Sequence, residues 1–213
     1  MELYLIRHGE TDFNLQGIVQ GGGVDSDLND KGRKQARAFF EHYKEMEFDA
    51  VYASTLKRTH QTLAPWVEEK KYNFVQDSAL VELGWGILEG KVPTPEEKKL
   101  FDWLREEWAK GNVHQGIEGG ESPQQCWNRL DPFLSSLQER HQGQKVLICS
   151  HGRTSRVLLS QVLGYGLSKM EEFPHSNTGL NILHFSPNGK IEAEVLNDTT
   201  HLQVLSSNGK IHS

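Results

Sequence analysis

The chain has 213 residues, of which 36% are hydrophobic and 24% charged, and its formal net charge is −6 at pH 7. This length is enough for one good hydrophobic core, and we expect a single domain over 1–213. The acidic balance, without any basic run, argues against nucleic acid or an anionic membrane surface as a partner. The chain has no apolar stretch near the roughly 18–20 residues of a membrane-spanning helix and no signal-peptide layout, so we expect a cytoplasmic protein that does not bind membranes.

The first part of the chain alternates strands and helices. Apolar runs predict strands at 2–7, 49–53 and about 72–76. Apolar residues at helical spacing predict helices at about 30–44 and 55–70. This alternation is typical of βαβ units, which build a mainly parallel sheet.

The sequence changes character between about 84 and 120. The run PTPEEKKLFDWLREEWAKG predicts a charged amphipathic helix with an apolar stripe of Leu100, Trp103, Leu104 and Trp108. We interpret 84–120 as a helical insertion that caps the functional site. A solvent-facing helix that packs its aromatic residues on the sheet is an alternative compatible with this interpretation. Exposed aromatic residues on this helix would also suit contact between two copies of the chain, so a homodimer stays open.

The remaining elements complete the predicted fold. Ser122 and Pro123 are typical of an N-cap and a first-turn proline, and they predict a helix to about 141. A strand at 145–149 is followed by a helix after His151.

Strands at 179–186 and 190–196 are joined by Pro187-Asn188-Gly189, a hairpin signal that makes one strand antiparallel, and the tail after Leu202 shows no clear element. The sequence therefore predicts the α/β class. Its expected architecture is a three-layer α/β/α sandwich with a mainly parallel sheet that contains one antiparallel strand.

Arg7, His8 and Gly9 come together directly after the first apolar strand. Open α/β sheets bind ligands at the carboxyl ends of their strands. A guanidinium there can hold a phosphate in bidentate fashion, and a neutral imidazole can act as a nucleophile. For an isolated Arg-His pair, two ordinary polar residues at a strand end would be the simpler interpretation.

A second histidine stands in the same sort of place. Ser150, His151 and Gly152 follow the strand at 145–149 and open a helix, where free backbone N–H groups and the helix dipole favour an anion. Taken alone, a histidine at a strand end is more often structural than catalytic.

Two more features point to the same chemistry. Ser54 follows the strand at 49–53 as an expected N-cap, and Arg58 lies one turn into the next helix. The alternative for Arg58 is a solvated surface arginine, because arginine is usually exposed. Glu82 stands among apolar and glycine residues in VELGWG, surroundings that suit a general acid.

These residues are sufficient for phosphoryl transfer, which needs an in-line nucleophile and positive charge on the equatorial oxygens. Arg7 and Arg58 supply the charge at any working pH, and the same cations disfavour the imidazolium of His8. A neutral His8 would attack phosphorus, and Glu82 would protonate the leaving alkoxide. This scheme requires no metal and no other cofactor. The ten histidines contain no pair at two-, three- or four-residue spacing, so we expect no local metal-ligand cluster.

Between residues 3 and 202 the chain contains, in order, the segments LIRHGETDFN, VQGGGVDSDLNDKGRKQA, VYASTLKRTHQT, VELGWGILEG, EGGES, ICSHG and NDTTHL. This set resembles the histidine phosphatase superfamily, which includes cofactor-dependent phosphoglycerate mutases and many small-molecule phosphatases. RHGET followed by SHG is the most specific part. The resemblance implies a phosphoglycerate mutase-like fold and one histidine phosphatase domain over 1–213.

The resemblance also implies roles for individual residues. His8 would be phosphorylated transiently on an imidazole nitrogen, and Glu82 would be the proton donor. Arg7, Arg58 and His151 would surround the transferring phosphoryl group. The residues expected to contact the substrate are Arg7, Asn14, Gln20, Arg58, His151 and Gly152.

Three positions depart from the family pattern. Phe13 stands where a tryptophan is frequent, and Gly21-Gly22-Gly23 lengthens the loop after Gln20. Arg153 stands where glycine is common after the His-Gly pair. It adds a cation near the site, which leaves open a selection for more acidic substrates.

The sequence thus predicts a metal-independent phosphatase that hydrolyses phosphate monoesters of small metabolites through a phosphohistidine. A cofactor-dependent phosphoglycerate mutase is the alternative. Mutases of this family carry a longer insertion after the second arginine segment, whereas GWGILEGKVPTP is short. An inactive phosphate-binding regulatory domain is a third interpretation, but such a domain would be expected to lack His8 or Glu82. The pattern does not name the phosphate ester.

Overall fold

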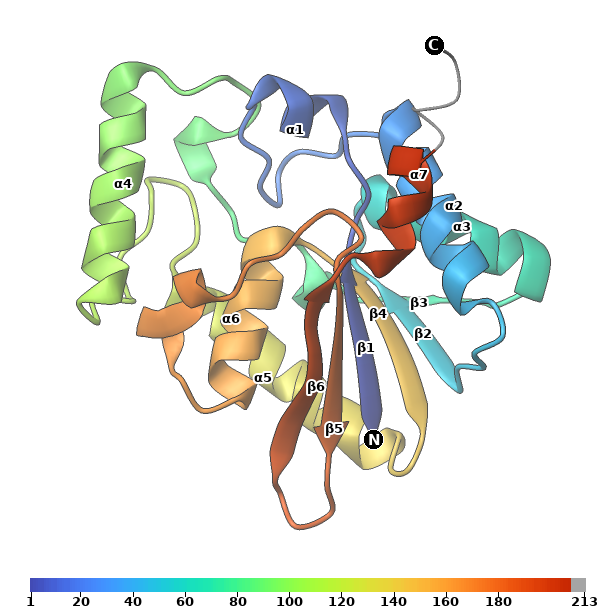
Figure 1. The fold of residues 1–213 in the computed structure, drawn as a ribbon. Coiled ribbons are helices and arrows are strands. Elements are labelled where there is room, and N and C mark those ends of the chain that lie inside the picture. The colour runs from blue at the N-terminus through green and yellow to red at the C-terminus, as the bar shows by residue number, and fades with distance from the viewer. Residues whose placement is uncertain (208–213) are drawn as a thin grey trace.

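The structure is a computed structural model that describes residues 1–207. Its centre is a six-stranded sheet with the order β3-β2-β4-β1-β5-β6 (Figure 1). The strands are β1 Glu2–Arg7, β2 Ala50–Ala53, β3 Val75–Gln76, β4 Lys145–Ser150, β5 Leu180–Phe185 and β6 Ile191–Asp198. β1, β2, β3 and β4 pair in parallel, and β5 runs antiparallel to both of its neighbours. The mainly parallel sheet with one antiparallel strand is confirmed.

Helices cover both faces of this sheet (Figure 1). They are α1 Asp12–Gln16, α2 Asp30–Tyr43, α3 Lys57–Lys70, α4 Pro95–Ala109, α5 Pro123–Arg140, α6 Gly152–Val162 and α7 Gln203–Ser207. Short 3₁₀ segments lie at Ser78–Leu80, Gly86–Leu88, Leu167–Glu172 and Thr200–Leu202. No helix within residues 1–207 is long and apolar enough to cross a bilayer.

The alternation of side chains along β1 explains the three layers. Leu3 and Leu5 belong to the core shared with α5 and α6, whereas Tyr4 and Ile6 belong to the core shared with α2 and α3. All four are buried, as expected for a central strand that is covered on both faces. The three-layer α/β/α sandwich predicted from the sequence is confirmed.

Strand register brings the two histidines together. Arg7, the last residue of β1, pairs with Ser150, the last residue of β4, and His8 and His151 directly follow these two strands. The backbone N–H of His8 donates to the carbonyl oxygen of Ser150 at 3.0 Å. Because parallel neighbouring strands end at the same edge of a sheet, the imidazole rings of His8 and His151 both lie at the carboxyl end of the sheet.

Helix starts follow their capping residues in two places and depart from the prediction in a third. α5 begins after the predicted N-cap Ser122, which forms a capping box with Gln125. α4 begins in the same way, with a capping box between Thr94 and Glu97. The prediction that Ser54 is the N-cap of α3 is wrong: α3 begins at Lys57 with Leu56 as its N-cap, after a bend at residues 55–56, and the Ser54 side chain accepts from the backbone N–H of Leu56 and contacts His151.

The amphipathic helix α4 buries a narrower stripe than predicted. Leu104 and Trp108 are buried as expected. Leu100 and Trp103, on the same apolar stripe, are 39% and 48% exposed. Phe101 packs inward instead, with its ring centroid 4.5 Å from that of Trp85.

The sequence prediction also missed two short helices and overestimated one strand. α1 depends on a capping box between Thr11 and Asn14, which is too short a pattern to carry hydrophobic periodicity. β3 has only two residues in the structure, at the edge of the sheet. In the tail, 203–207 form α7, and 208–213 lie outside the described residues.

Candidate active site

His8 is a buried imidazole whose tautomer is set by the backbone. Its Nδ1 lies 2.7 Å from the carbonyl oxygen of Gly9, and its side chain is almost inaccessible to solvent. A carbonyl oxygen only accepts hydrogen bonds, so Nδ1 carries the proton and Nε2 keeps its lone pair. Burial, with the positive charges of Arg58 and Arg7, holds the pKa of His8 well below its usual value. At neutral pH this side chain is therefore an uncharged imidazole.

His151 is neutral for the same reasons and has the opposite tautomer. Arg58 Nε donates to His151 Nδ1 at 3.1 Å, so the proton of His151 stands on Nε2, which donates to Ser54 Oγ at 2.6 Å. Burial and the charge of Arg58 lower the pKa of His151 well below its usual value. The ring centroids of the two histidines are 5.2 Å apart.

Arg58 is fully buried, so the alternative of a solvated surface arginine is wrong. Its Nη1 donates to the carbonyl oxygen of Val24 at 2.6 Å and its Nη2 to that of Gly21 at 3.4 Å. The lengthened glycine loop therefore folds onto this guanidinium. Burial lowers the pKa of Arg58 to about 10, which keeps the side chain charged at neutral pH.

Arg7 is held at one end only. Its Nη1 donates to the carbonyl oxygen of His175 at 2.8 Å, whereas its Nε is buried without a hydrogen-bond partner in the part of the chain that the structure describes. A buried donor without a partner is costly, so this N–H is available to bind an acceptor atom of a ligand. Burial lowers the pKa of Arg7 from its usual value.

Glu82 binds the N-terminus of α6. Its Oε1 accepts hydrogen bonds from the backbone N–H of Leu83 at 3.0 Å, from that of Thr154 at 2.9 Å and from Thr154 Oγ1 at 3.2 Å. Its Oε2 accepts one from the backbone N–H of Arg153 at 3.2 Å. The expectation of apolar surroundings is therefore only half right, because the carboxylate is buried but meets four donors. The sequence pattern predicted an anion at the N-terminus of α6, and in the structure the side chain of Glu82 takes part of that place.

Gly152 brings Arg7 and Glu82 close together. A Cβ atom on Gly152 would lie 3.4 Å from Arg7 Nε and 3.7 Å from Glu82 Oε2. The missing side chain thus leaves both groups facing the same small space. A larger residue here would fill the space between the unpartnered arginine donor and the carboxylate.

Asn14 and Gln20 lie next to this cluster and bind Thr11. Asn14 Oδ1 accepts from the backbone N–H of Thr11 at 3.2 Å, and Gln20 Nε2 donates to Thr11 Oγ1 at 2.8 Å. Asn177 connects them to the end of β1, because its Nδ2 donates to the His8 carbonyl oxygen at 2.9 Å and lies 3.4 Å from Asn14 Oδ1. The structure thus gathers Arg7, His8, Arg58, Glu82, His151 and Gly152, with Asn14 and Gln20 one layer outside.

Sequence reasoning missed several residues that hold the site in place. Thr62 Oγ1 accepts from the backbone N–H of Gly9 at 2.9 Å, and Thr154 binds Glu82. Both lie within a helix turn of a predicted site residue, which is a usable signal. Asn177 and His175 lie in a loop without a regular pattern. His175 contacts Arg7 through its backbone carbonyl oxygen, which every residue type has, so the sequence could not identify this contact.

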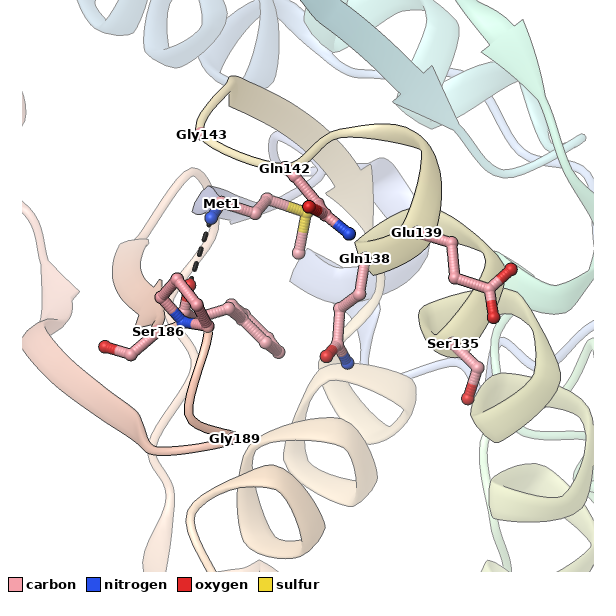
Figure 2. Close-up of a pocket in the computed structure, with 10 residues that line it drawn as sticks. Met1, Ser135, Gln138, Glu139, Gln142, Gly143, Ser186 and Gly189 are labelled. Atoms are coloured by element: carbon pink, nitrogen blue, oxygen red, sulfur yellow. Dashed lines mark hydrogen bonds between the residues drawn. The ribbon is translucent and has the colours of Figure 1, made fainter.

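Groups elsewhere are less suited to chemistry. Cys126 and Cys149 are buried and unpaired, and burial raises the pKa of Cys126 to about 12. Within residues 1–207, no three His, Cys, Asp or Glu side chains are placed to hold a metal ion. Figure 2 shows a hollow at the other end of the sheet, beside Met1 and Gly189, and none of the predicted site residues lines it.

Comparisons with known proteins agree with this geometry. The family model described as "Histidine phosphatase superfamily (branch 1)" matches residues 3–199. Phosphoserine phosphatase 1 of Hydrogenobacter thermophilus is 31% identical over 203 residues, which are 95% of this chain and 94% of that protein. The probable phosphoglycerate mutase GpmB of Escherichia coli is 33% identical over 164 residues, which are 77% of this chain and 75% of that protein.

A solved structure gives the same answer for the fold. The α-ribazole phosphatase of Shigella flexneri superposes with a TM-score of 0.80 at 25% identity, over 93% of this chain and 96% of that chain. The resemblance found in the motifs and the α/β fold with its phosphoglycerate mutase-like neighbours are thereby confirmed. This chain belongs to branch 1 of the histidine phosphatase superfamily.

Proposed function

We propose that this chain hydrolyses phosphate monoesters of small metabolites through a phosphohistidine at His8. The observation that carries the proposal is a neutral, buried imidazole whose Nε2 keeps its lone pair, close to the buried guanidinium of Arg58 and the partly buried side chain of Arg7. Such a group is a nucleophile without further activation, and the arginines supply the charge that a phosphoryl group requires.

In the proposed first step, His8 Nε2 attacks phosphorus and forms an N–P bond while the bond from phosphorus to the ester oxygen breaks. Protonated Glu82 gives its proton to that oxygen, and the alcohol leaves. In the second step Glu82 takes a proton from water, the hydroxide forms the new P–O bond, and the N–P bond breaks. The products are inorganic phosphate and the original His8.

The remaining site residues have proposed roles in binding. Arg7 Nε is a buried donor without a partner among residues 1–207, which supports a hydrogen bond to a phosphate oxygen. His151 holds Arg58 in position through the contact at Nδ1. Asn14, Gln20 and Gly152 would border the substrate, and the segment 84–120 would cap it.

Relatives support the phosphatase assignment at the level of substrate class. Two of the proteins named above are a phosphoserine phosphatase and an α-ribazole phosphatase. The substrates in these names have different alcohol portions, and the phosphate ester is the part they have in common. The third is a probable phosphoglycerate mutase, which keeps the mutase as the alternative. Small phosphorylated metabolites are thus the proposed partners of this chain.

Single turnover with a ³²P-labelled ester tests the proposal. We expect acid-labile label on wild-type His8, none in His8→Ala, and loss of essentially all turnover in that variant. His184→Ala is the matched control, because His184 lies half-exposed on β5 beside Glu194. Near-wild-type turnover of His8→Ala would show the mechanism to be wrong.

The same preparation separates the alternatives. With 3-phosphoglycerate, we expect release of inorganic phosphate, no isomeric ester and no stimulation by 2,3-bisphosphoglycerate. Primer-dependent isomer formation faster than phosphate release would favour the mutase. Excess EDTA should leave turnover unchanged, and activity lost in EDTA and restored by a divalent ion would contradict the histidine mechanism.

A further inference from the structure

A second group of arginines lies beside the proposed phosphate site. Arg153 and Arg156 extend from α6 and Arg105 from α4, and all three approach the carboxylate of Glu171. Arg156 Nη1 donates to Glu171 Oε2 at 2.8 Å, and Arg105 Nε donates to the same oxygen at 3.2 Å. Arg153 Nη1 forms an ion pair with Oε1. Three guanidinium groups therefore share one carboxylate.

Arg153 is the least solvated of the three. Its side chain is 15% exposed, and its guanidinium carbon lies 5.5 Å from the ring centroid of Trp85 and 5.6 Å from that of Phe101. Aromatic faces stabilise a cation but do not cancel its charge. Burial and the like charges of Arg156 and Arg105 lower the pKa of Arg153 to about 9, although Glu82 opposes this shift.

Arg105 does not depend on Glu171 alone, because it also approaches Asp102 at 3.7 Å near the surface. Within residues 1–207 the ion pairs of Arg153 and Arg156 involve only Glu171. Positive charge at Arg153 is therefore incompletely matched, in a poorly hydrated place where an added anion interacts more strongly than in water.

Arg153 also stands on the side of the site where the alcohol must leave. Its backbone N–H donates to Glu82 Oε2, the proposed acid, at 3.2 Å. A Cβ atom on the preceding residue, Gly152, would lie 3.4 Å from Arg7 Nε. With phosphorus at His8 and the leaving oxygen at Glu82, the rest of the alcohol extends past Glu82 toward Arg153 and Trp85.

We propose that Arg153 binds a second acidic group on the alcohol portion of the substrate, a carboxylate or a further phosphate, and that the enzyme selects such esters over neutral ones. This inference depends on the proposed phosphatase function, because it takes the direction of the alcohol from the roles of His8 and Glu82. Glu171 is the internal anion that occupies the guanidinium when the substrate is absent.

Three esters with a common three-carbon skeleton test the inference. Glycerol 1-phosphate has a neutral end, 3-phosphoglycerate has a carboxylate, and glycerol 1,3-bisphosphate has a second phosphate. kcat/KM would be measured for each, with p-nitrophenyl phosphate as the common reference, in the wild type, Arg153→Gln, Arg153→Lys and Glu171→Gln. Arg37→Gln is the matched control, because Arg37 pairs with Glu69 on an exposed face of α2. Thermal melting would check that each variant is folded.

We expect the wild type to prefer at least one acidic ester over glycerol 1-phosphate by tenfold or more. Arg153→Gln should bring this ratio close to one, Arg153→Lys should retain part of it, and Arg37→Gln should leave it unchanged. Glu171→Gln should raise the ratio, since it removes the competing anion. The ester whose preference depends on Arg153 identifies the acidic group as carboxylate or phosphate.

The inference is overturned if the wild-type ratios are near one, or if Arg153→Gln leaves them unchanged. It is also overturned if Glu171→Gln and Arg153→Gln lower the ratio alike, because the cluster would then be a structural support. Hydrolysis of p-nitrophenyl phosphate without discrimination among the three esters contradicts this inference alone. Absence of phosphate release from all four esters contradicts the proposed function.

Discussion

Replacement of Glu82 by glutamine separates the proposed acid role from the structural role of the same side chain. The structure gives Glu82 four hydrogen bonds, three at Oε1 and one at Oε2. A glutamine that keeps its oxygen at the first position retains three of them. Its NH₂ group then faces the backbone N–H of Arg153, where a 3.2 Å hydrogen bond is replaced by two opposed donors.

The stability cost of this change is that of one unsatisfied buried donor, about 1–3 kcal/mol. For a chain of this size each kcal/mol lowers Tm by about 2–4 °C, so Glu82→Gln should fold and melt somewhat earlier than the wild type. The loss of the acid is a separate effect. General acid catalysis contributes about 10²–10⁴-fold for an alkoxide that needs a proton, and much less for p-nitrophenolate, which leaves unprotonated.

The assay compares kcat on an alkyl phosphate and on p-nitrophenyl phosphate, with Tm measured on the same samples. Glu89→Gln is the matched control, because Glu89 also accepts two backbone hydrogen bonds, from Trp85 at 2.7 Å and Gly23 at 2.9 Å. We expect a similar fall in Tm for the control without any dependence on the leaving group. Equal losses on both esters in Glu82→Gln would refute proton donation and leave Glu82 as a support for α6.

Three further predictions concern stability. Burial lowers the pKa of His8, His151 and His175 (to about 3 for the last), so at pH 7 to 5 the unfolded chain binds more protons at these histidines than the folded chain. The free energy of unfolding should therefore fall as pH drops from 7 to 5, with a slope for each histidine that approaches about 1.4 kcal/mol per pH unit well below pH 6.5. Urea titrations that give a constant stability over this range would contradict neutral histidines. Trp66→Ala removes a fully buried indole packed against aromatic rings and should cost about 3–5 kcal/mol in the same assay, whereas a loss below about 1 kcal/mol would contradict the packing. Millimolar phosphate should raise Tm of the wild type, and a rise of equal size in Arg58→Gln would place the anion elsewhere.

The strand-end residues could be predicted from the sequence because their positions follow from local pattern. An apolar run that ends in Arg7-His8 and another that ends in Ser150-His151 place both histidines at one edge, once the strands are parallel neighbours. The start of α5 at Ser122 was equally local, since its capping box lies within four residues.

The parts that failed depend on contacts between distant segments. Glu82 meets the N-terminus of α6 across 72 residues of chain, which no periodicity records. Ser54 has the side chain of an N-cap and accepts from the backbone N–H of Leu56 at 3.2 Å, but its hydroxyl also contacts the distant His151, and α3 begins only at Lys57. Trp103 lies on the predicted apolar stripe of α4 but is half-exposed, whereas Phe101, outside that stripe, packs on Trp85 beside Trp108. The orientation of a helix depends on what it packs against, which its own sequence pattern does not record.

The arginines of this protein show how one residue type serves two purposes. Arg129 donates two hydrogen bonds to the Glu121 carboxylate, at 2.7 and 2.9 Å, and this pair cancels its charge. Arg58 and Arg7 instead donate to neutral carbonyl oxygens, and within residues 1–207 neither forms an ion pair at 4 Å or less. A carbonyl oxygen orients a guanidinium group but does not neutralise its charge. A charge that is buried without an ion pair lowers the stability of the fold. In a chain with net charge −6, we expect these two guanidinium groups, which form no close ion pair within the described residues, to attract a phosphate to the proposed site rather than to the surface.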